Sequence, residues 1–292
     1  MRPHKGVALL CVPLFVWCAW SRAYHYSLWS DNSQAYLEAI RESSLRIPEP
    51  FARRNVRAGI VTHHFLASGM MVRFFERLRD TASPGTIILI GPNHFHHGRG
   101  NISLSSLPWK TCFGVVETDR LIIDHIKAAT TLAEDTEAFT GEHSVGVLIP
   151  LIHYYFPHSR VVPILIDINA NESQLRILRG VLTQLLRKKQ FFLLLSMDFS
   201  HNSTAEVAET RDRDARQAIS TFDMDRIGRL YLDCHKGLWL VLAALREIGP
   251  IEADIEEHSN SSRLSRNPSQ RNVTSYFTIC FSLKTERRDG AN

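Results

Sequence analysis

Apolar residues along the chain fall into two patterns, short continuous runs and longer stretches with helical spacing. Short apolar runs between turn signals are typical of buried strands. They cover residues 57–62, 86–92, 160–167, 191–198 and 275–283. Apolar positions three or four residues apart predict helices over residues 33–43, 66–80, 119–129, 142–156, 172–188, 204–219 and 236–248. Strands that alternate with helices predict an α/β fold with a mainly parallel central sheet.

Two segments fall outside this alternation. Residues 256–275 are polar and poor in apolar positions, so we expect a long loop there. Residues 1–23 have a basic start, then 15 mostly apolar residues from 6 to 20, then Ser-Arg-Ala. Fifteen residues rise only about 22 Å as a helix, short of a bilayer core of about 30 Å.

The order of basic, apolar and small residues predicts a secretory signal, and so an exported protein. An uncleaved N-terminal anchor is the alternative, and it would give the chain its one contact with a membrane. Residues 24–292 are then expected to form a single α/β domain with a polar tail after about residue 284.

The amino-acid composition excludes several classes of protein. The chain has 292 residues, 44% of them hydrophobic, which supplies enough apolar material for a large core. The net charge of +4 is small, and no basic stripe with interleaved aromatic residues occurs, so nucleic acid is not an expected partner. Five cysteines without a CxxC pair exclude a zinc ribbon and a disulfide scaffold.

Three of the strand-type runs end close to a histidine: His63, His94 and His201. The carboxyl ends of parallel strands meet at one edge of an α/β sheet, where ligands bind. We therefore expect these imidazoles to converge on a site for iron, zinc, copper or manganese. Protons would compete for the imidazoles, so metal binding should weaken as the pH falls through about 6.5.

Neighbouring histidines leave two points open. His64 follows His63 directly, and only one of the two need face the site. His96 and His97 lie beyond His94 and are candidates for surface residues.

Other polar residues join the candidate site. Glu142 and His143 stand at the start of a predicted helix, whose partial positive charge disfavours imidazolium. His143 is therefore the candidate general acid or base, and Glu142 either binds the metal or orients a histidine. Asp198 follows the strand-type run that precedes His201 and is expected to orient an imidazole. Cys234, directly before a helix, is a candidate additional ligand.

Several motifs together resemble the Memo family, also known as AmmeMemoRadiSam system protein B. They are GIVTHHFLASG, LIGPNH, EHSVGVLIP, VVPILID and SMDFSH, and the resemblance extends from about residue 24 to about residue 281. The family is similar in fold to class III extradiol dioxygenases, which implies a three-layer α/β sandwich. The resemblance also implies that His63, His94 and His201 face the metal, with His143 and Asp198 in the same cleft.

The chain departs from the family pattern at two places. The position of a family cysteine corresponds to Leu232, whereas Cys234 lies two residues on. Gly146 replaces a second acid that usually follows the Glu-His-Ser motif.

These observations favour a mononuclear non-haem metal enzyme of redox, dioxygenase-like type that acts on a small molecule. Fe(II) is the favoured metal, with copper or zinc as alternatives. A second hypothesis is a non-catalytic binding or regulatory protein that uses the same cleft for a peptide or small ligand. Metal-dependent hydrolysis is a third. The sequence indicates no oligomeric state.

Overall fold

The computed structural model describes residues 23–44 and 55–284. The expected signal or anchor, apart from Ala23, and the expected polar tail lie outside these residues. Within the described ranges, no helix is both long and apolar enough to cross a membrane.

A seven-stranded sheet forms the centre of the molecule. Its strands are β2 (Val56–Val61), β3 (Thr86–Pro92), β4 (Ile102–Leu104), β7 (Arg160–Ile166), β8 (Phe191–Ser196), β9 (Ile251–Asn260) and β10 (Ser275–Leu283). They are ordered β4-β7-β3-β8-β2-β10-β9. The middle strands β7, β3, β8 and β2 run parallel, and β4, β10 and β9 add antiparallel edges. The predicted mainly parallel α/β fold is confirmed.

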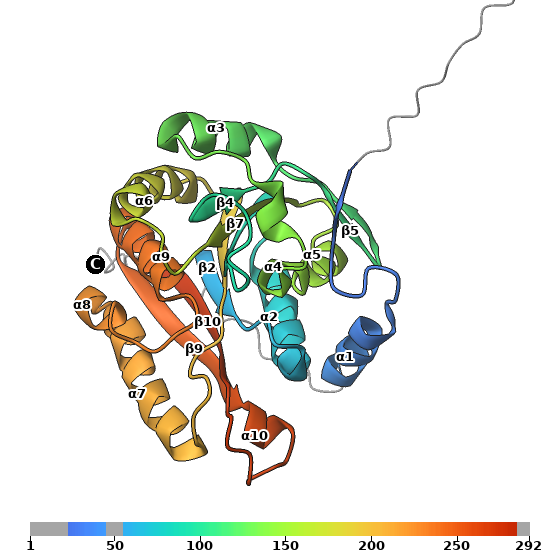
Figure 1. Cartoon of the computed structure of the whole chain (residues 1–292), viewed down its shortest axis with the longest axis vertical. Coiled ribbons are helices and arrows are strands. Elements are labelled where there is room, and N and C mark those ends of the chain that lie inside the picture. The colour runs from blue at the N-terminus through green and yellow to red at the C-terminus, as the bar shows by residue number, and fades with distance from the viewer. Residues whose placement is uncertain (1–22, 45–54, 285–292) are drawn as a thin grey trace, which may run out of the picture.

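Helices cover both faces of this sheet (Figure 1). One face carries α3 (Arg120–Thr130), α6 (Glu172–Leu186), α7 (Ala205–Thr221), α8 (Met224–Ile227) and α9 (His235–Ile248). The other face carries α1 (Gln34–Ser44), α2 (Ser68–Thr81), α4 (His143–Gly146) and α5 (Ile149–Tyr155). The three layers agree with the expected sandwich.

The middle strands are mainly apolar because both of their faces are covered. Along β3, Ile88 and Ile90 pack into the core under α6 and α9, whereas Ile87 and Leu89 pack into the core under α2 and α5. All four side chains are fully buried. The period of two residues in a strand produces this division.

A second, three-stranded sheet was not predicted from the sequence. It consists of β1 (His25–Tyr26), β5 (Trp109–Thr111) and β6 (Gly114–Val116) in the order β1-β5-β6. Trp109 is fully buried in the core that also contains α5. Strands of two or three residues are too short to show a hydrophobic period.

Two sequence predictions about secondary structure were wrong. The segment expected as a long loop over 256–275 begins with the second half of β9 and with α10 (Ser261–Leu264). The acidic side chains in this half strand are paired with arginines of α2, as in the Arg73–Glu257 ion pair at 2.6 Å, so charge did not preclude a strand. The helix expected over 142–156 is divided into α4 and α5, with Pro150 in the first turn of α5.

The fold brings the carboxyl ends of β2, β3 and β8 together at one edge. These strands are neighbours in the order β3-β8-β2, and all run parallel. At the end of β3, a Cβ on Gly91 would lie 2.7 Å from the Ser144 hydroxyl. Only glycine therefore allows α4 to lie so close to this strand end.

Candidate metal centre

The three histidines predicted at strand ends lie together at the carboxyl edge of the sheet, in a partly exposed cluster that we call the cleft. His63 follows β2, His94 follows β3, and His201 follows β8. The ring centroids of His63 and His94 are 5.0 Å apart. His63 is buried, whereas 24% of the His94 side chain and 29% of the His201 side chain are exposed. The adjacent parallel strands account for this convergence.

Asp233 lies at the point where the three imidazoles meet. Its Oδ2 is 3.3 Å from Nε2 of His63, 3.7 Å from Nε2 of His94 and 3.8 Å from Nε2 of His201. Two atoms that each bind one ion at about 2.1 Å are at most about 4.2 Å apart. Each imidazole is therefore close enough to Asp233 to bind the same ion as that carboxylate. Ligand atoms within 4.8 Å of one another occur in two groups of the described residues, His63 with His94 and His143, and His63 with Asp198 and Asp233. Binding of one ion by all four proposed ligands would need the imidazoles to move closer together.

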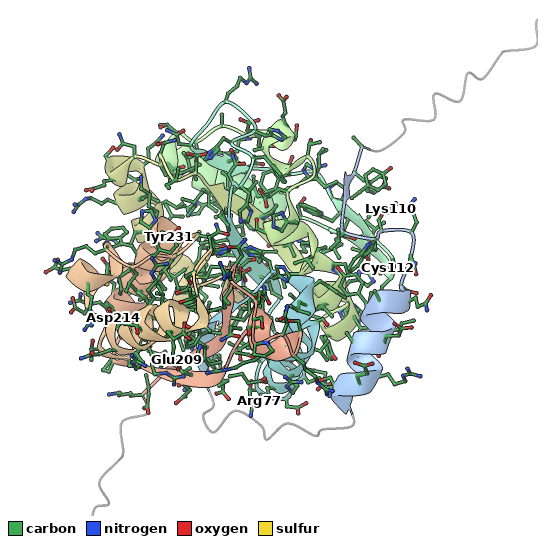
Figure 2. All side chains as sticks on the ribbon, turned by 60° about the horizontal axis from the view of Figure 1, so that its bottom comes forward. Arg77, Lys110, Cys112, Glu209, Asp214 and Tyr231 are labelled. Carbon is green, nitrogen blue, oxygen red and sulfur yellow. The ribbon has the colours of Figure 1, made fainter. Side chains whose placement is uncertain are left out.

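The loop between α8 and α9 holds Asp233 in this place. Tyr231, labelled in Figure 2, lies two residues earlier and packs against the guanidinium of Arg211 on α7, 4.1 Å from the ring centroid. The backbone N–H of Asp198 donates to Asp233 Oδ2 at 3.0 Å. The hydrogen bond from Asp198 thus fixes the carboxylate, and the Tyr231 contact attaches the loop to α7.

Hydrogen bonds set the tautomer of His63. Its Nδ1 is 3.0 Å from the hydroxyl of Ser196, and that hydroxyl donates its proton to the carbonyl of Ser144. The hydroxyl must therefore accept from His63, so Nδ1 carries the hydrogen and the Nε2 lone pair points into the cleft. Burial lowers the pKa of His63 to about 4, which keeps this imidazole neutral.

Glu142 orients His94. One carboxylate oxygen is 2.9 Å from His94 Nδ1, and the other accepts the His94 backbone N–H at 2.8 Å. Burial opposes the charge on Glu142, but hydrogen bonds from His94 and Ser144 outweigh it and lower the pKa of the carboxyl to about 2. Of the two roles expected for Glu142, the geometry fits the orienting one.

Asp198 lies in the same cleft but orients no imidazole N–H. Its Oδ1 accepts from the Thr62 hydroxyl and from the His63 backbone N–H, and Oδ2 is 3.9 Å from His63 Nε2. Burial and the neighbouring charge of Asp233 raise the pKa of Asp198 to about 6. The group that orients His63 through its N–H is Ser196 instead, and the sequence did not suggest it.

One pair of acceptors in the cleft faces one another without a donor between them. The Nε2 lone pair of His63 faces the Asp233 carboxylate, which is an acceptor as well. Asp233 Oδ1 and His201 Nε2 are buried and have no hydrogen-bond partner among the described residues. Buried acceptors in contact are unfavourable unless a proton or a metal cation lies between them. The donor set of this chain therefore fits a bound cation.

His143 stands at the mouth of this cleft. Its ring stacks on His94 at a centroid distance of 4.4 Å, and 43% of its side chain is exposed. Burial, followed by the neighbouring imidazoles His63 and His94, lowers the pKa of His143 to about 4. The expected neutrality agrees with this, but the expected cause does not, since α4 has four residues and burial is the largest effect.

The remaining sequence candidates lie outside the cleft. The His64 ring nitrogen caps the following turn by accepting from the backbone N–H of Leu66, so His63 is the member of the pair that faces the site. His96 and His97 are exposed. The thiol of Cys234 lies against Gly237 and belongs to the apolar core, so it offers no ligand atom to the histidines.

Asp233 is the main residue that sequence reasoning missed. It follows no strand, and the neighbouring Cys234 was the ligand candidate that the sequence offered in this segment. A carboxylate two residues before the helix that starts at His235 was the available signal. A search for ligands confined to strand ends cannot find it, because the loop after α8 returns to the cleft only in three dimensions.

Fold and site together define an α/β protein with a histidine- and carboxylate-lined cleft at the carboxyl edge of its sheet. The family model for Memo-like protein matches residues 23–280, so the chain belongs to the Memo family. The resemblance drawn from the sequence motifs is confirmed.

Relatives at moderate identity agree with this assignment. A MEMO1 family protein of Methanosarcina barkeri is 28% identical over 250 residues, 82% of this chain and 91% of that protein. One of Caldivirga maquilingensis is 30% identical over 191 residues, 64% of this chain and 63% of that protein. The crystal structure of an uncharacterized Escherichia coli K12 protein matches 77% of this chain and 99% of its own, with a TM-score of 0.53 and 14% identity. That likeness concerns the fold alone.

Proposed function

We propose that this protein binds one divalent metal ion through His63, His94, His201 and Asp233, and uses it in dioxygenase-like redox chemistry on a small molecule. The observation that carries the proposal is the approach of three imidazole Nε2 atoms to within 3.8 Å of one carboxylate oxygen. Imidazoles with a carboxylate and an open position are typical ligands of non-haem Fe(II). Copper and zinc remain the alternatives.

A ferrous ion in this place would supply Lewis acidity and one-electron chemistry toward oxygen. The chain's own residues prepare the site. Glu142 and Ser196 hold the Nδ1 hydrogens of His94 and His63, so both Nε2 atoms point inward. His143, neutral and partly exposed, can accept a proton from a substrate hydroxyl at the mouth of the cleft.

A non-catalytic role is the second candidate. Partial exposure of His94, His143 and His201 leaves the cleft open to solvent, which suits a peptide as well as a small molecule. In that case the metal would shape a binding site without turnover.

Metal content and oxygen uptake test the proposal together. The protein is purified without a metal-affinity tag, and its metals are determined by elemental analysis. We expect one metal per chain in the wild type and none in His94→Ala. His143→Ala should keep the metal but lose about 10²–10⁴-fold in oxygen uptake with catechol as probe, the usual contribution of a general acid or base.

The matched control is His97→Ala, because His97 lies on the same loop with its ring stacked on Phe95, outside the cleft. It should alter neither quantity. Metal content unchanged in His94→Ala would overturn the site. A bound metal without oxygen uptake would support the non-catalytic candidate.

Export is a separate proposal, supported by the sequence of residues 1–23 alone. N-terminal sequencing of the protein from its own cells should find a mature chain that begins near Tyr24. An intact Met1 on cytosolic protein would contradict it.

A further inference from the structure

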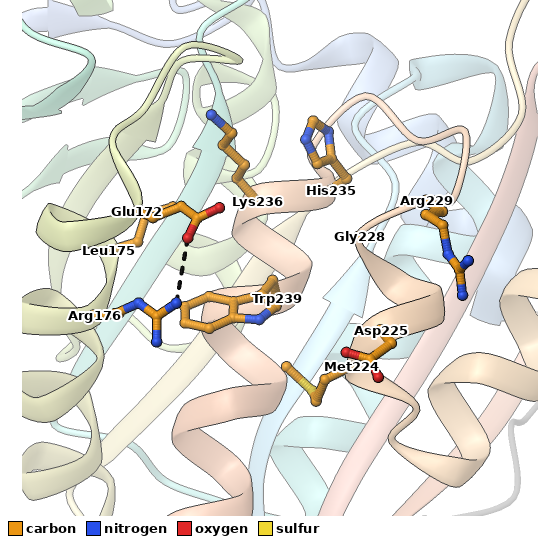
Figure 3. A pocket seen from close by; sticks show the side chains of 10 residues that line it. All are labelled: Glu172, Leu175, Arg176, Met224, Asp225, Gly228, Arg229, His235, Lys236 and Trp239. Atoms are coloured by element: carbon orange, nitrogen blue, oxygen red, sulfur yellow. Dashed lines mark hydrogen bonds and ion pairs between the residues drawn. The ribbon is translucent and has the colours of Figure 1, made fainter.

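A cavity of about 430 Å³ lies between α6, α8 and α9, outside the three-histidine cleft. None of His63, His94, His201 and Asp233 lines it. Figure 3 shows His235 and Lys236 at its upper rim, with Trp239 and Met224 below them. Sites for small molecules have volumes of about 300–1,000 Å³, so this cavity has the size of a ligand site.

Positively charged side chains outnumber negatively charged ones in the lining of the cavity. Arg176, Arg229 and Lys236 are cationic, whereas Glu172 and Asp225 are anionic. Glu172 and Arg176 form an ion pair at 3.3 Å and so neutralise one another.

Of the remaining charges, one cation is in excess. Lys236 Nζ donates to the carbonyl of Ala170 at 2.6 Å, a contact that positions the ammonium without cancelling its charge. Arg229 and Asp225 form no ion pair with each other or with any other described residue. The cavity therefore favours a ligand with one negative charge over a neutral molecule.

The apolar part of the wall is flat on one side. Trp239 is half-buried and offers an indole face, and Met224 and Leu175 complete this surface. Neither the Trp239 indole N–H nor the His235 ring has a hydrogen-bond partner within the described part of the chain. A planar group can thus lie against the indole while its polar end meets donors at the rim.

We propose that this cavity is a second ligand site, which binds a small organic monoanion with a flat apolar part, of the aromatic carboxylate class. The planar part lies against Trp239 and Met224, and the carboxylate lies toward Arg229, on the opposite side of the cavity from Lys236 (Figure 3). The proposal does not depend on a metal in the three-histidine cleft.

Calorimetric titration with three probes tests both halves of this assignment. Benzoate carries charge and ring, benzamide carries the ring alone, and acetate carries the charge alone. We expect a dissociation constant on the order of 1 mM for benzoate, with the other two at least about fivefold weaker. Equal binding of benzoate and benzamide, or no saturable benzoate binding, would overturn the proposal.

Three variants test whether benzoate binds in this cavity. Arg229→Gln should weaken benzoate about fivefold, the effect of a half-exposed charge pair, and leave benzamide unchanged. Arg226→Gln is the matched control, because Arg226 lies on α8 but pairs with Asp214 at 2.6 Å outside the cavity. Benzoate binding should persist in His94→Ala. Its loss there would place the anion in the metal cleft and refute a second site.

Discussion

Two regions of the molecule place a histidine beside a buried carboxylate, and they differ in whether that carboxylate is satisfied. Between α7 and β9, Asp212 accepts from Ser200 at 3.2 Å and lies 2.8 Å from His258 Nε2. Each of its oxygens has one partner. In the cleft, Asp233 faces three imidazoles, yet its Oδ1 has no partner among the described residues.

The difference separates a structural pair from a binding site. Asp212 and His258 complete one another, and His258 is further covered by the Phe277 ring at 4.3 Å. In the cleft, His63 Nε2 and Asp233 Oδ1 are acceptors that lack a donor among the described residues, a state that costs free energy unless a cation enters. Proximity of histidine and aspartate alone is therefore a poor criterion for a metal site, and unmet hydrogen-bonding capacity is a better one.

The largest expected effect is a loss of metal affinity in Asp233→Asn. The same substitution at Asp212, in the other region, serves as its control. Asp233→Asn removes the one anionic ligand from the proposed set. If four ligands share the about 10–16 kcal/mol typical of structural zinc sites, one accounts for about 2.5–4 kcal/mol, or about 10²–10³-fold in affinity. Titration of metal-free protein with Fe(II) or Zn(II) measures this loss.

Asp212→Asn is the control for that measurement. It should leave metal affinity within about threefold of the wild type, because Asp212 touches none of the proposed ligands. Equal losses in the two variants would mean that the comparison between a binding site and a structural pair is mistaken.

The free energy of unfolding should change in the reverse order, with the larger loss in Asp212→Asn. In metal-free protein, Asp212→Asn breaks a buried charged hydrogen bond to His258 and should lower the free energy of unfolding by about 2 kcal/mol. Asp233→Asn should change it by less than about 1 kcal/mol, because it removes attraction to His94 and also repulsion of Asp198. Urea denaturation in the presence of a chelator gives both values. A larger loss in Asp233→Asn would show that Asp233 is structural.

Much of the fold could be predicted from the sequence because the middle strands are buried on both faces. The run TIILIGP has no polar side chain between Ile87 and Ile90, and only a strand covered on both sides needs that pattern. The edge strand β9 escaped prediction because its outer positions carry Glu256 and Glu257, whose partners lie on α2. Such pairing is invisible before the fold is known.

The candidate site, like the fold, could be predicted from the sequence only in part. His63, His94 and His201 could be found because topology alone brings strand ends together. The roles of Ser196 and Asp233 depend on where a hydroxyl points and where a loop returns. Neither follows from a residue's neighbours in the chain.

The pH dependence of metal binding sharpens the comparison further. Burial lowers the pKa of His94, but hydrogen bonds and charges from Asp233 and Glu142 outweigh it and raise the pKa to about 9 in the metal-free cleft. The proton on Nε2 must leave before a metal binds. Apparent affinity should therefore rise about tenfold per pH unit up to about pH 9 and then level off.

This break lies well above the value of about 6.5 expected from an unperturbed histidine. Chelator competition across this pH range measures it. Glu142→Gln removes one of the charges that raise the pKa, so the break should move to lower pH. A break that stays near 6.5 in the wild type would mean that His94 does not share its proton with Asp233.

The smallest effect on metal affinity is expected for a substitution of Cys234. This variant tests whether Asp233 or its neighbour Cys234 binds the metal. The thiol is 3% exposed, and burial raises its pKa well above the ordinary value, so it stays protonated and is a poor metal ligand. Its Sγ would lie 2.5 Å from a Cβ on Gly237, among apolar side chains of β3 and β8. Cys234→Ala should therefore keep metal affinity within about twofold and lower the free energy of unfolding by about 1 kcal/mol, through lost packing alone. Titration with Zn(II), which favours thiolate, is the most demanding measurement, because a thiol that turned toward the histidines would cost far more than twofold when removed. A loss approaching that of Asp233→Asn would make Cys234 a ligand and Asp233 its support.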